Sequence, residues 1–191
     1  MTRSLRGDIY LLPGGGDHPP DFRTLRPVGA VYVRALNMPD QDWRTGLPGI
    51  TSRAEWFALD YNGTFTAKTP GRYRFIPIGN DGSRLIIDGK VVVDDYGVHD
   101  AATATGEADL GPGPHRLEAQ YFHGPRERLA FQLRCKGPTG PEAVFPGCGL
   151  DVGAPSLWRL WLWWVAALAA LGAGVIWMTR RRLALEAHGA P

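Results

Sequence analysis

Residues 73–95 read YRFIPIGNDGSRLIIDGKVVVDD, and this stretch predicts three consecutive antiparallel strands joined by two turns. Tyr73 and Phe75 alternate with arginines, which is the period-two pattern of a strand with one buried face. The NDG at residues 80–82 supplies the chemistry of a tight turn. The DG at residues 88–89 lies between two β-branched runs, the strongest short-range signal of a hairpin. We therefore expect an antiparallel sheet at the centre of the fold.

The chain on both sides of this centre extends the β pattern. Further alternating stretches occupy residues 56–67, 115–122 and 129–135. Glycine (25) and proline (16) are frequent among the 191 residues, and no long amphipathic helix precedes residue 155. These features predict an all-β antiparallel sandwich over residues 28–150. Residues 1–27 are expected to form a loop-rich lead-in, and residues 37–52 a structured loop anchored by Trp43.

Charge and motifs argue against nucleic-acid binding and catalysis. The formal net charge is +2, and lysine and arginine do not cluster on the predicted domain, so the basic stripe that phosphate binding requires is missing. Ser83 follows a glycine but lacks the setting of a nucleophile elbow. Asp94 and Asp95 are interpreted as turn formers, because no base or orienting group accompanies them. We expect no catalytic residues, no bound cofactor and no enzymatic activity.

Cys135 and Cys148 enclose the segment CKGPTGPEAVFPGC. No second pair and no nearby histidine accompany them, so a zinc site is not predicted. A disulfide closing this loop would stabilise the fold by about 3 kcal/mol in an oxidising compartment. The alternative is two unpaired thiols.

The composition changes after residue 155. After a linker at residues 151–158, residues 160–178 (LWLWWVAALAALGAGVIWM) carry no charge. At a rise of about 1.5 Å per residue this run crosses a hydrocarbon layer of about 30 Å. We predict a single transmembrane helix over residues 159–179, with the bilayer as its surroundings.

The orientation of this helix follows from the arginines at residues 180–182. The positive-inside bias predicts a cytoplasmic tail at residues 180–191 and an extracytoplasmic, periplasm-like location for the β-domain. Residues 1–27 contain no apolar run long enough for a signal peptide. A cytoplasmic β-domain with the arginines outside therefore stays open as the alternative.

The predicted helix carries a stripe of small residues, Ala166, Ala170 and Gly174, four positions apart. Such a stripe lets a second helix approach closely. Trp161 and Trp164 lie near the first end of the helix, where their indoles could fill gaps between neighbouring membrane subunits. We expect integral membrane proteins as partners.

The β-domain resembles the protective-antigen fourteen-kilodalton domain, a β-sandwich found in a toxin protective antigen, in adhesins and as an insertion in glycosidases. The resemblance covers roughly residues 28–135. It is carried by WFALDYNGTFTAKTPGRYRF (56–75), NDGSRLIIDGKVVVDDYG (80–97), GPGPHRLEAQYFHG (111–124) and LAFQLRC (129–135). The resemblance implies the sandwich fold expected above.

In lectin members of that family, two adjacent aspartates hold a calcium ion that binds sugar hydroxyls. The matching positions here are Asn80 and Asp81. Calcium prefers several hard oxygen ligands with negative charge among them, so the amide of Asn80 would weaken the site. Asn80 and Asp81 are the candidates for a calcium or sugar site. The alternative is a turn capped by the two side chains.

Two functions follow from these predictions. The first is a non-enzymatic, single-pass accessory subunit that docks on a larger respiratory, photosynthetic or envelope assembly and stabilises it. The second is a membrane-anchored, calcium-dependent carbohydrate-binding module.

Overall fold

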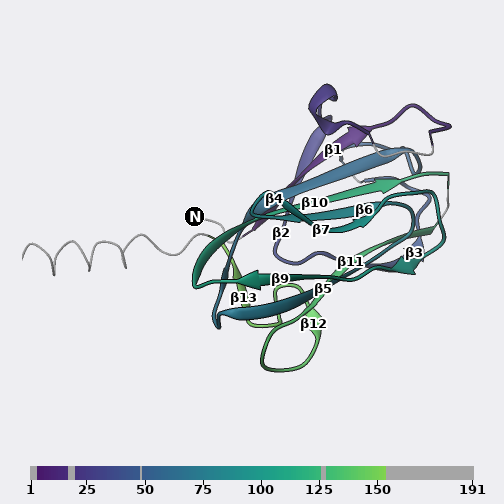
Figure 1. Cartoon of the computed structure of the whole chain (residues 1–191). Helices are drawn as coiled ribbons and strands as arrows, with labels where there is room; N and C mark the ends of the chain where they lie inside the picture. The colour runs from purple at the N-terminus through teal and green to yellow at the C-terminus, as the bar shows by residue number, and fades with distance from the viewer. Residues whose placement is uncertain (1–3, 17–19, 48, 126–127, 154–191) are drawn as a thin grey trace, which may run out of the picture. The chain divides into compact units, whose positions relative to one another are not determined.

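The computed structural model describes residues 4–16, 20–47, 49–125 and 128–153, and these form an all-β domain with two facing sheets (Figure 1). The first sheet has the order β2-β1-β4-β10-β6-β7, with β13 also paired to β4. The second has the order β12-β11-β5-β8, with β3 on β11 and β9 on β5. The strands are β1 (Leu5–Leu11), β2 (Gly29–Val33), β3 (Asn37–Asp42), β4 (Phe57–Ala67), β5 (Gly71–Gly79), β6 (Ser83–Ile87), β7 (Lys90–Asp95), β8 (Ala102–Thr103), β9 (Gly106–Leu110), β10 (Gly113–His123), β11 (Arg128–Lys136), β12 (Ala143–Val144) and β13 (Leu150–Val152). A short 3-10 helix, η1, spans Phe22–Thr24.

The predicted antiparallel sandwich is confirmed, and so is its hairpin. Asp88 and Gly89 both have positive φ, at 51° and 77°, which is the backbone of a type I′ turn between β6 and β7. Alternation also holds from Leu59 onward in β4 and up to Ala119 in β10, whereas both faces are buried at the paired ends of these strands. Their inward residues belong to an aromatic layer in which Tyr121 on β10 stacks on Phe131 of β11, with ring centroids 4.7 Å apart.

Two sequence predictions were wrong at the N-terminal side. Residues 1–27 are more than a lead-in, because β1 lies between β2 and β4 in the first sheet and buries Leu5 and Ile9. Residues 37–52 are not all loop, because β3 pairs with β11. Pro39 obscured that strand in the sequence, since proline cannot donate to a ladder and is tolerated where a strand is paired on one side only.

Asn62 and Gly63, a pair typical of turns, are here a continuous part of β4. Gly63 is needed there for packing, because a Cβ at this position would lie 2.5 Å from the Leu5 side chain. The glycine thus lets β1 pack closely on β4.

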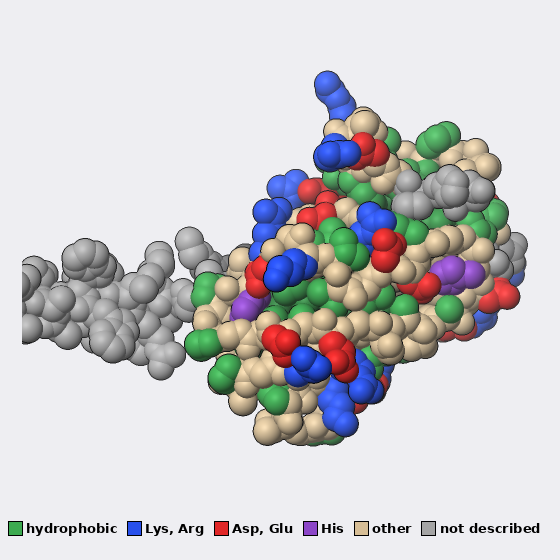
Figure 2. Space-filling model, viewed as in Figure 1, with side chains coloured by type: hydrophobic (Ala, Val, Ile, Leu, Met, Phe, Trp, Pro, Cys, Tyr) green, Lys and Arg blue, Asp and Glu red, His purple; other side chains and the backbone are tan. Residues whose placement is uncertain are grey.

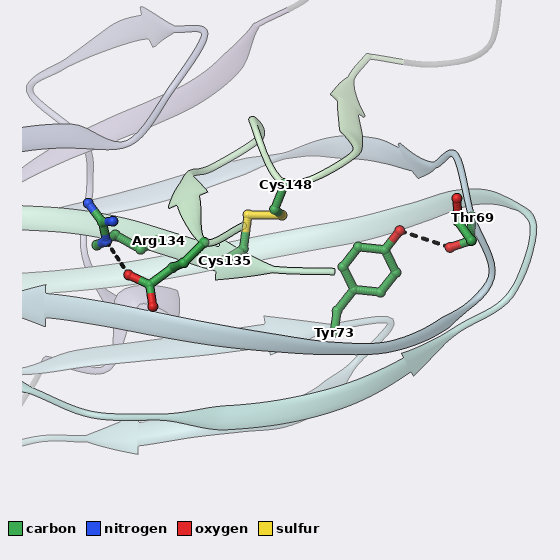
Figure 3. Close-up of a disulfide and its surroundings, with 6 residues drawn as sticks. Thr69, Tyr73, Arg134, Cys135 and Cys148 are labelled. Atoms are coloured by element: carbon green, nitrogen blue, oxygen red, sulfur yellow. Dashed lines mark hydrogen bonds and ion pairs between the residues drawn. A yellow bond between two sulfur atoms is a disulfide. The ribbon is translucent and has the colours of Figure 1, made fainter. Parts of the chain in front are cut away.

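Cys135 and Cys148 form a disulfide with their Cα atoms 5.7 Å apart (Figure 3). Both are buried, and the bond holds the loop after β11 against the core. Tyr73 lies beside it and donates a hydrogen bond of 2.8 Å to the carbonyl oxygen of Thr69. The disulfide joins the two ends of the proline-rich excursion.

None of the described residues belongs to a helix with the length and apolar character needed to cross a bilayer. The predicted span at residues 159–179, with Ala166, Ala170, Gly174, Trp161 and Trp164, lies outside the described residues. On the face shown in Figure 2, basic and acidic side chains are interspersed rather than gathered by sign.

His115 ties the β6–β7 turn to β10. Its Nδ1 lies 2.7 Å from Asp88 Oδ2 and its Nε2 lies 2.9 Å from the carbonyl oxygen of Gly111. Two acceptors require two N–H donors, so the ring fits this place in its protonated form. Partial burial opposes the charge, but the hydrogen bonds to Asp88 and Gly111 outweigh it and raise the pKa of His115. Burial would raise the pKa of Asp88, but the hydrogen bonds from His115 and from the Arg116 N–H outweigh this effect and lower the pKa.

This pair predicts a pH dependence of folding. The stabilisation from His115 should be complete below its unfolded pKa of about 6.5 and lost as the pH rises through its raised folded pKa. Because Asp88 is half exposed, the loss should be only about 0.5–1 kcal/mol. Urea unfolding from pH 6 to pH 9 measures it. Asp88→Asn, which tolerates positive φ, should flatten this dependence, and an unchanged slope would contradict the assignment.

Candidate functional site

Strand register brings five loops to one end of the sandwich, which we call the loop end. Phe57 at the start of β4 pairs with His123 at the end of β10, and Ser83 pairs with Tyr121. In the second sheet, the start of β11 pairs with the ends of β3 and β5. The loop end therefore gathers residues 12–16, 43–47, 49–56, 80–82 and 96–101 around Gly124, which follows β10.

The predicted site residues Asn80 and Asp81 lie at the loop end but point into the protein. Asn80 is 5% exposed and Asp81 is fully buried. Asp81 has a φ of 63°, and its N–H donates to the carbonyl oxygen of His99 at 3.0 Å. Asp81 Oδ2 accepts a 2.9 Å hydrogen bond from the N–H of Gly124. The aspartate therefore fastens the turn after β10 to the turn between β5 and β6.

His123 and Tyr121 complete this buried cluster. The Nδ1 of His123 lies 3.5 Å from Asp81 Oδ2 and 3.2 Å from the Tyr121 hydroxyl. The His123 ring also packs against Phe57 at a centroid distance of 5.2 Å. Burial and the nearby Asp81 raise the pKa of Tyr121 well above its ordinary value, so the phenol stays neutral. No sequence motif indicated His123, because its partners Asp81 and Phe57 are distant in the chain.

These contacts test whether calcium fits at Asn80 and Asp81. The ion takes six to eight oxygen ligands, as a rule. Here the Asp81 carboxylate is occupied by an N–H donor and faces an imidazole. Within the described ranges, no three His, Cys, Asp or Glu side chains gather to hold a metal ion. The described residues do not fit a calcium ion here, and calcium at this pair stays an unsupported prediction.

Two tryptophans line an open cleft of about 540 Å³ at the same end. Its walls come from the loop after β1 and the loop between β3 and β4: Gly14, Trp43, Arg44, Arg53, Ala54, Glu55 and Trp56. The Nε1 of Trp43 is buried and has no hydrogen-bond partner among the described residues. Arg53 donates to the carbonyl oxygen of Leu12 at 2.7 Å, and this hydrogen bond connects the loop before β4 to the loop after β1.

Trp56 has a backbone conformation that is unusual for a bulky residue. Its φ is 56°, in the left-handed region, where a side chain of this size costs of order 1–3 kcal/mol. Its carbonyl oxygen accepts from the N–H of Leu12 at 2.8 Å. The sequence indicated Trp56 only as one side of an alternating strand. Such local strain is found most often where a protein binds a ligand.

The buried aspartate yields a stability prediction. Asp81→Ala should destabilise the domain by about 1–3 kcal/mol, because the Gly124 N–H loses its acceptor inside the protein. Asp81→Asn keeps an acceptor oxygen and tolerates positive φ, so its loss should be smaller. Equilibrium urea unfolding of both variants measures the difference. Equal stability of wild type and Asp81→Ala would show that Asp81 does not fasten the two turns.

Known proteins share the fold of this domain. The model of the PA14 domain family matches residues 34–145. A search of the curated proteins finds no match. Among solved structures, a PA14 sugar-binding domain from an RTX adhesin is similar, with 18% identity and a TM-score of 0.66 over 81% of this chain and 100% of that chain.

Two further structures share the fold. The A domain of epithelial adhesin 9 from Candida glabrata, in complex with Galβ1-4GlcNAc, has 14% identity and a TM-score of 0.56 over 80% of this chain and 91% of that chain. An anti-sigma factor domain-containing protein has 19% identity and a TM-score of 0.61 over 80% of this chain and 48% of that chain, so the match spans about half of its length. The family model covers more than half of the sequence, and the chain belongs to the PA14 domain family.

Proposed function

We propose that the domain is a non-enzymatic carbohydrate-binding module and that the cleft of Trp43 and Trp56 is its sugar site. The observation that carries this proposal is the pair of tryptophans in one open cleft, one with an unpartnered N–H and the other with a strained backbone. The related sugar-binding domain and the adhesin in complex with Galβ1-4GlcNAc support the ligand class.

The chemistry of the cleft suits a sugar ring. A pyranose has an apolar C–H face and a rim of hydroxyl groups, each of which donates and accepts hydrogen bonds. Ligand sites of this kind combine aromatic walls with a few placed polar groups. Trp43 and Trp56 offer indole faces for the C–H face of a sugar, while Arg53 and Glu55 supply a donor and an acceptor at the rim.

Trp56 gives the sharpest test, because Trp56→Gly removes the ring and also relieves the positive φ. We expect wild type to bind Galβ1-4GlcNAc or another disaccharide of a glycan panel, and Trp56→Gly to bind it at least about tenfold more weakly. Isothermal titration measures this affinity, and thermal unfolding checks that the variant is folded.

The matched control is Tyr32→Ala, which removes an aromatic ring that is 66% exposed on β2. Its affinity should equal that of wild type. Removing divalent ions with EDTA should also leave binding unchanged, because the described residues at Asn80 and Asp81 do not fit calcium. No binding by wild type across the panel, or equal weakening by Tyr32→Ala, would contradict this site.

Docking on membrane proteins is the second candidate function, and we propose it as the setting in which the module works. It is supported by the charge-free run at residues 160–178 and the three arginines that follow it. An extracytoplasmic location would also favour the disulfide between Cys135 and Cys148.

This setting predicts the behaviour of the full chain in extraction. Purification in a mild detergent should recover it with stoichiometric membrane partners, as judged by native electrophoresis and mass spectrometry. A full chain that is recovered only as a monomer, or that is released from membranes without detergent, would contradict the docking role.

A further inference from the structure

A second, larger cleft lies on the outer face of the first sheet and shares no lining residue with the tryptophan cleft. Its volume is about 710 Å³. The floor is formed by β4, β10 and β6, and the walls include the aromatic rings of Tyr10, Phe22 and Tyr96. Tyr10 and Phe22 meet edge to face, with ring centroids 5.3 Å apart. We call it the sheet-face cleft.

Strand register assembles the floor of this cleft. Asp60 on β4 pairs with Gln120 on β10, which pairs with Arg84 on β6. Glu118 lies two residues before Gln120 on the same face and is diagonal to Asp60. These polar residues alternate with buried aromatic and aliphatic residues along the same strands. The alternation that buries one face of β4 and β10 therefore determines which polar residues are neighbours on the outer face of the sheet.

Most polar groups on the floor already have partners. Gln120 accepts from the Tyr96 hydroxyl at 2.6 Å and donates to Glu118 at 2.7 Å. The guanidinium of Arg84 lies 4.1 Å from the centroid of the Tyr96 ring and donates to Asp94 at 3.0 Å. Two atoms differ, because Asp60 Oδ1 and Arg84 Nε are buried and have no hydrogen-bond partner within the described part of the chain.

The surroundings of Asp60 also disfavour its negative charge. Burial raises the pKa of its carboxyl to about 6, with further contributions from the negative charges of Glu118 and Asp8. A hydrogen bond from Asn62 and the charge of Arg116 oppose the shift but do not cancel it. Arg84 is already paired with Asp94. On the floor, the two carboxylates of Asp60 and Glu118 therefore have one guanidinium beside them, that of Arg116. Asp60 and Glu118 outnumber this guanidinium, and one further positive N–H donor would balance their charge.

We propose that the sheet-face cleft binds an organic ammonium group, which the carboxylates of Asp60 and Glu118 hold beneath the aromatic walls. Charge-assisted hydrogen bonds to carboxylates and contacts with aromatic faces are the standard means of binding such cations. A metal ion suits the cleft less well, because the described residues offer no set of three acidic, histidine or cysteine ligands. The ammonium group could belong to an amino sugar or to a lysine side chain.

The experiment uses the full chain in detergent and two matched probes. A trimer of β1,4-linked glucosamine carries ammonium groups, and its fully N-acetylated twin carries none. We expect the glucosamine trimer to bind and the acetylated trimer not to bind at the sheet-face cleft, as measured by isothermal titration. A peptide Gly-Lys-Gly with blocked ends identifies the source, since stronger binding of the peptide would assign the ammonium to a protein side chain.

Asp60→Asn removes the charge and should weaken binding of the ammonium probe at least about tenfold. Glu118→Gln should weaken it as well. Asp109→Asn is the matched control, because Asp109 is exposed and lies on β9 in the other sheet. Asp60→Asn should keep or raise the melting temperature, since it removes a charge that burial disfavours. Glu118→Gln therefore serves as the test if Asp60→Asn proves unstable.

Two further readouts separate this proposal from the sugar site at the loop end. Ammonium binding should weaken as the pH falls below about 6, because Asp60 becomes protonated among Asp8, Glu118 and Arg116. Trp56→Gly should leave it unchanged. Equal binding of the two trimers, or an affinity unaffected by both Asp60→Asn and Glu118→Gln, would overturn the proposal.

Discussion

The antiparallel register of β4 on β10 is the constraint on which the rest of this structure depends. Eleven residue pairs, from Phe57 with His123 to Ala67 with Gly113, set it. Because side chains alternate between the two faces of a sheet, a slip of one residue would exchange the buried and exposed sets. This register places the aromatic layer around Tyr121 inside and Asp60 outside. It also fixes which loops meet at the end where β10 stops.

Two regions with different chemistry follow from that one pairing. The loop end combines a buried polar cluster, in which Asp81 fastens two turns, with an open cleft walled by tryptophans. The sheet face carries a row of polar residues that includes a carboxyl oxygen without a partner among the described residues. The buried cluster provides rigidity, because its groups bond to one another. Each cleft is lined by a residue with a buried polar atom, Trp43 Nε1 or Asp60 Oδ1, that has no hydrogen-bond partner among the described residues.

The sequence predicted those parts of the fold that depend on local chemistry. The DG turn at residues 88–89 and the alternation in β4 could be recognised without a structure, because each depends on neighbouring residues alone. β1 was missed because Gly7 and charged side chains interrupt its pattern, and β3 because it contains Pro39. The sheet-face cleft could not be predicted, because Asp60 and Glu118 are 58 residues apart in the sequence and become neighbours only when β4 pairs with β10. The positive φ of Trp56 left no sequence signal either.

Amide hydrogen exchange tests the central register most directly. If the pairing of β4 with β10 holds the domain together, the amides in the middle of both strands should exchange only through global unfolding. The amides of β2 and β7, at the two edges of the first sheet, should exchange faster. Exchange in the middle of β4 and β10 that is as fast as at these edges would contradict the account.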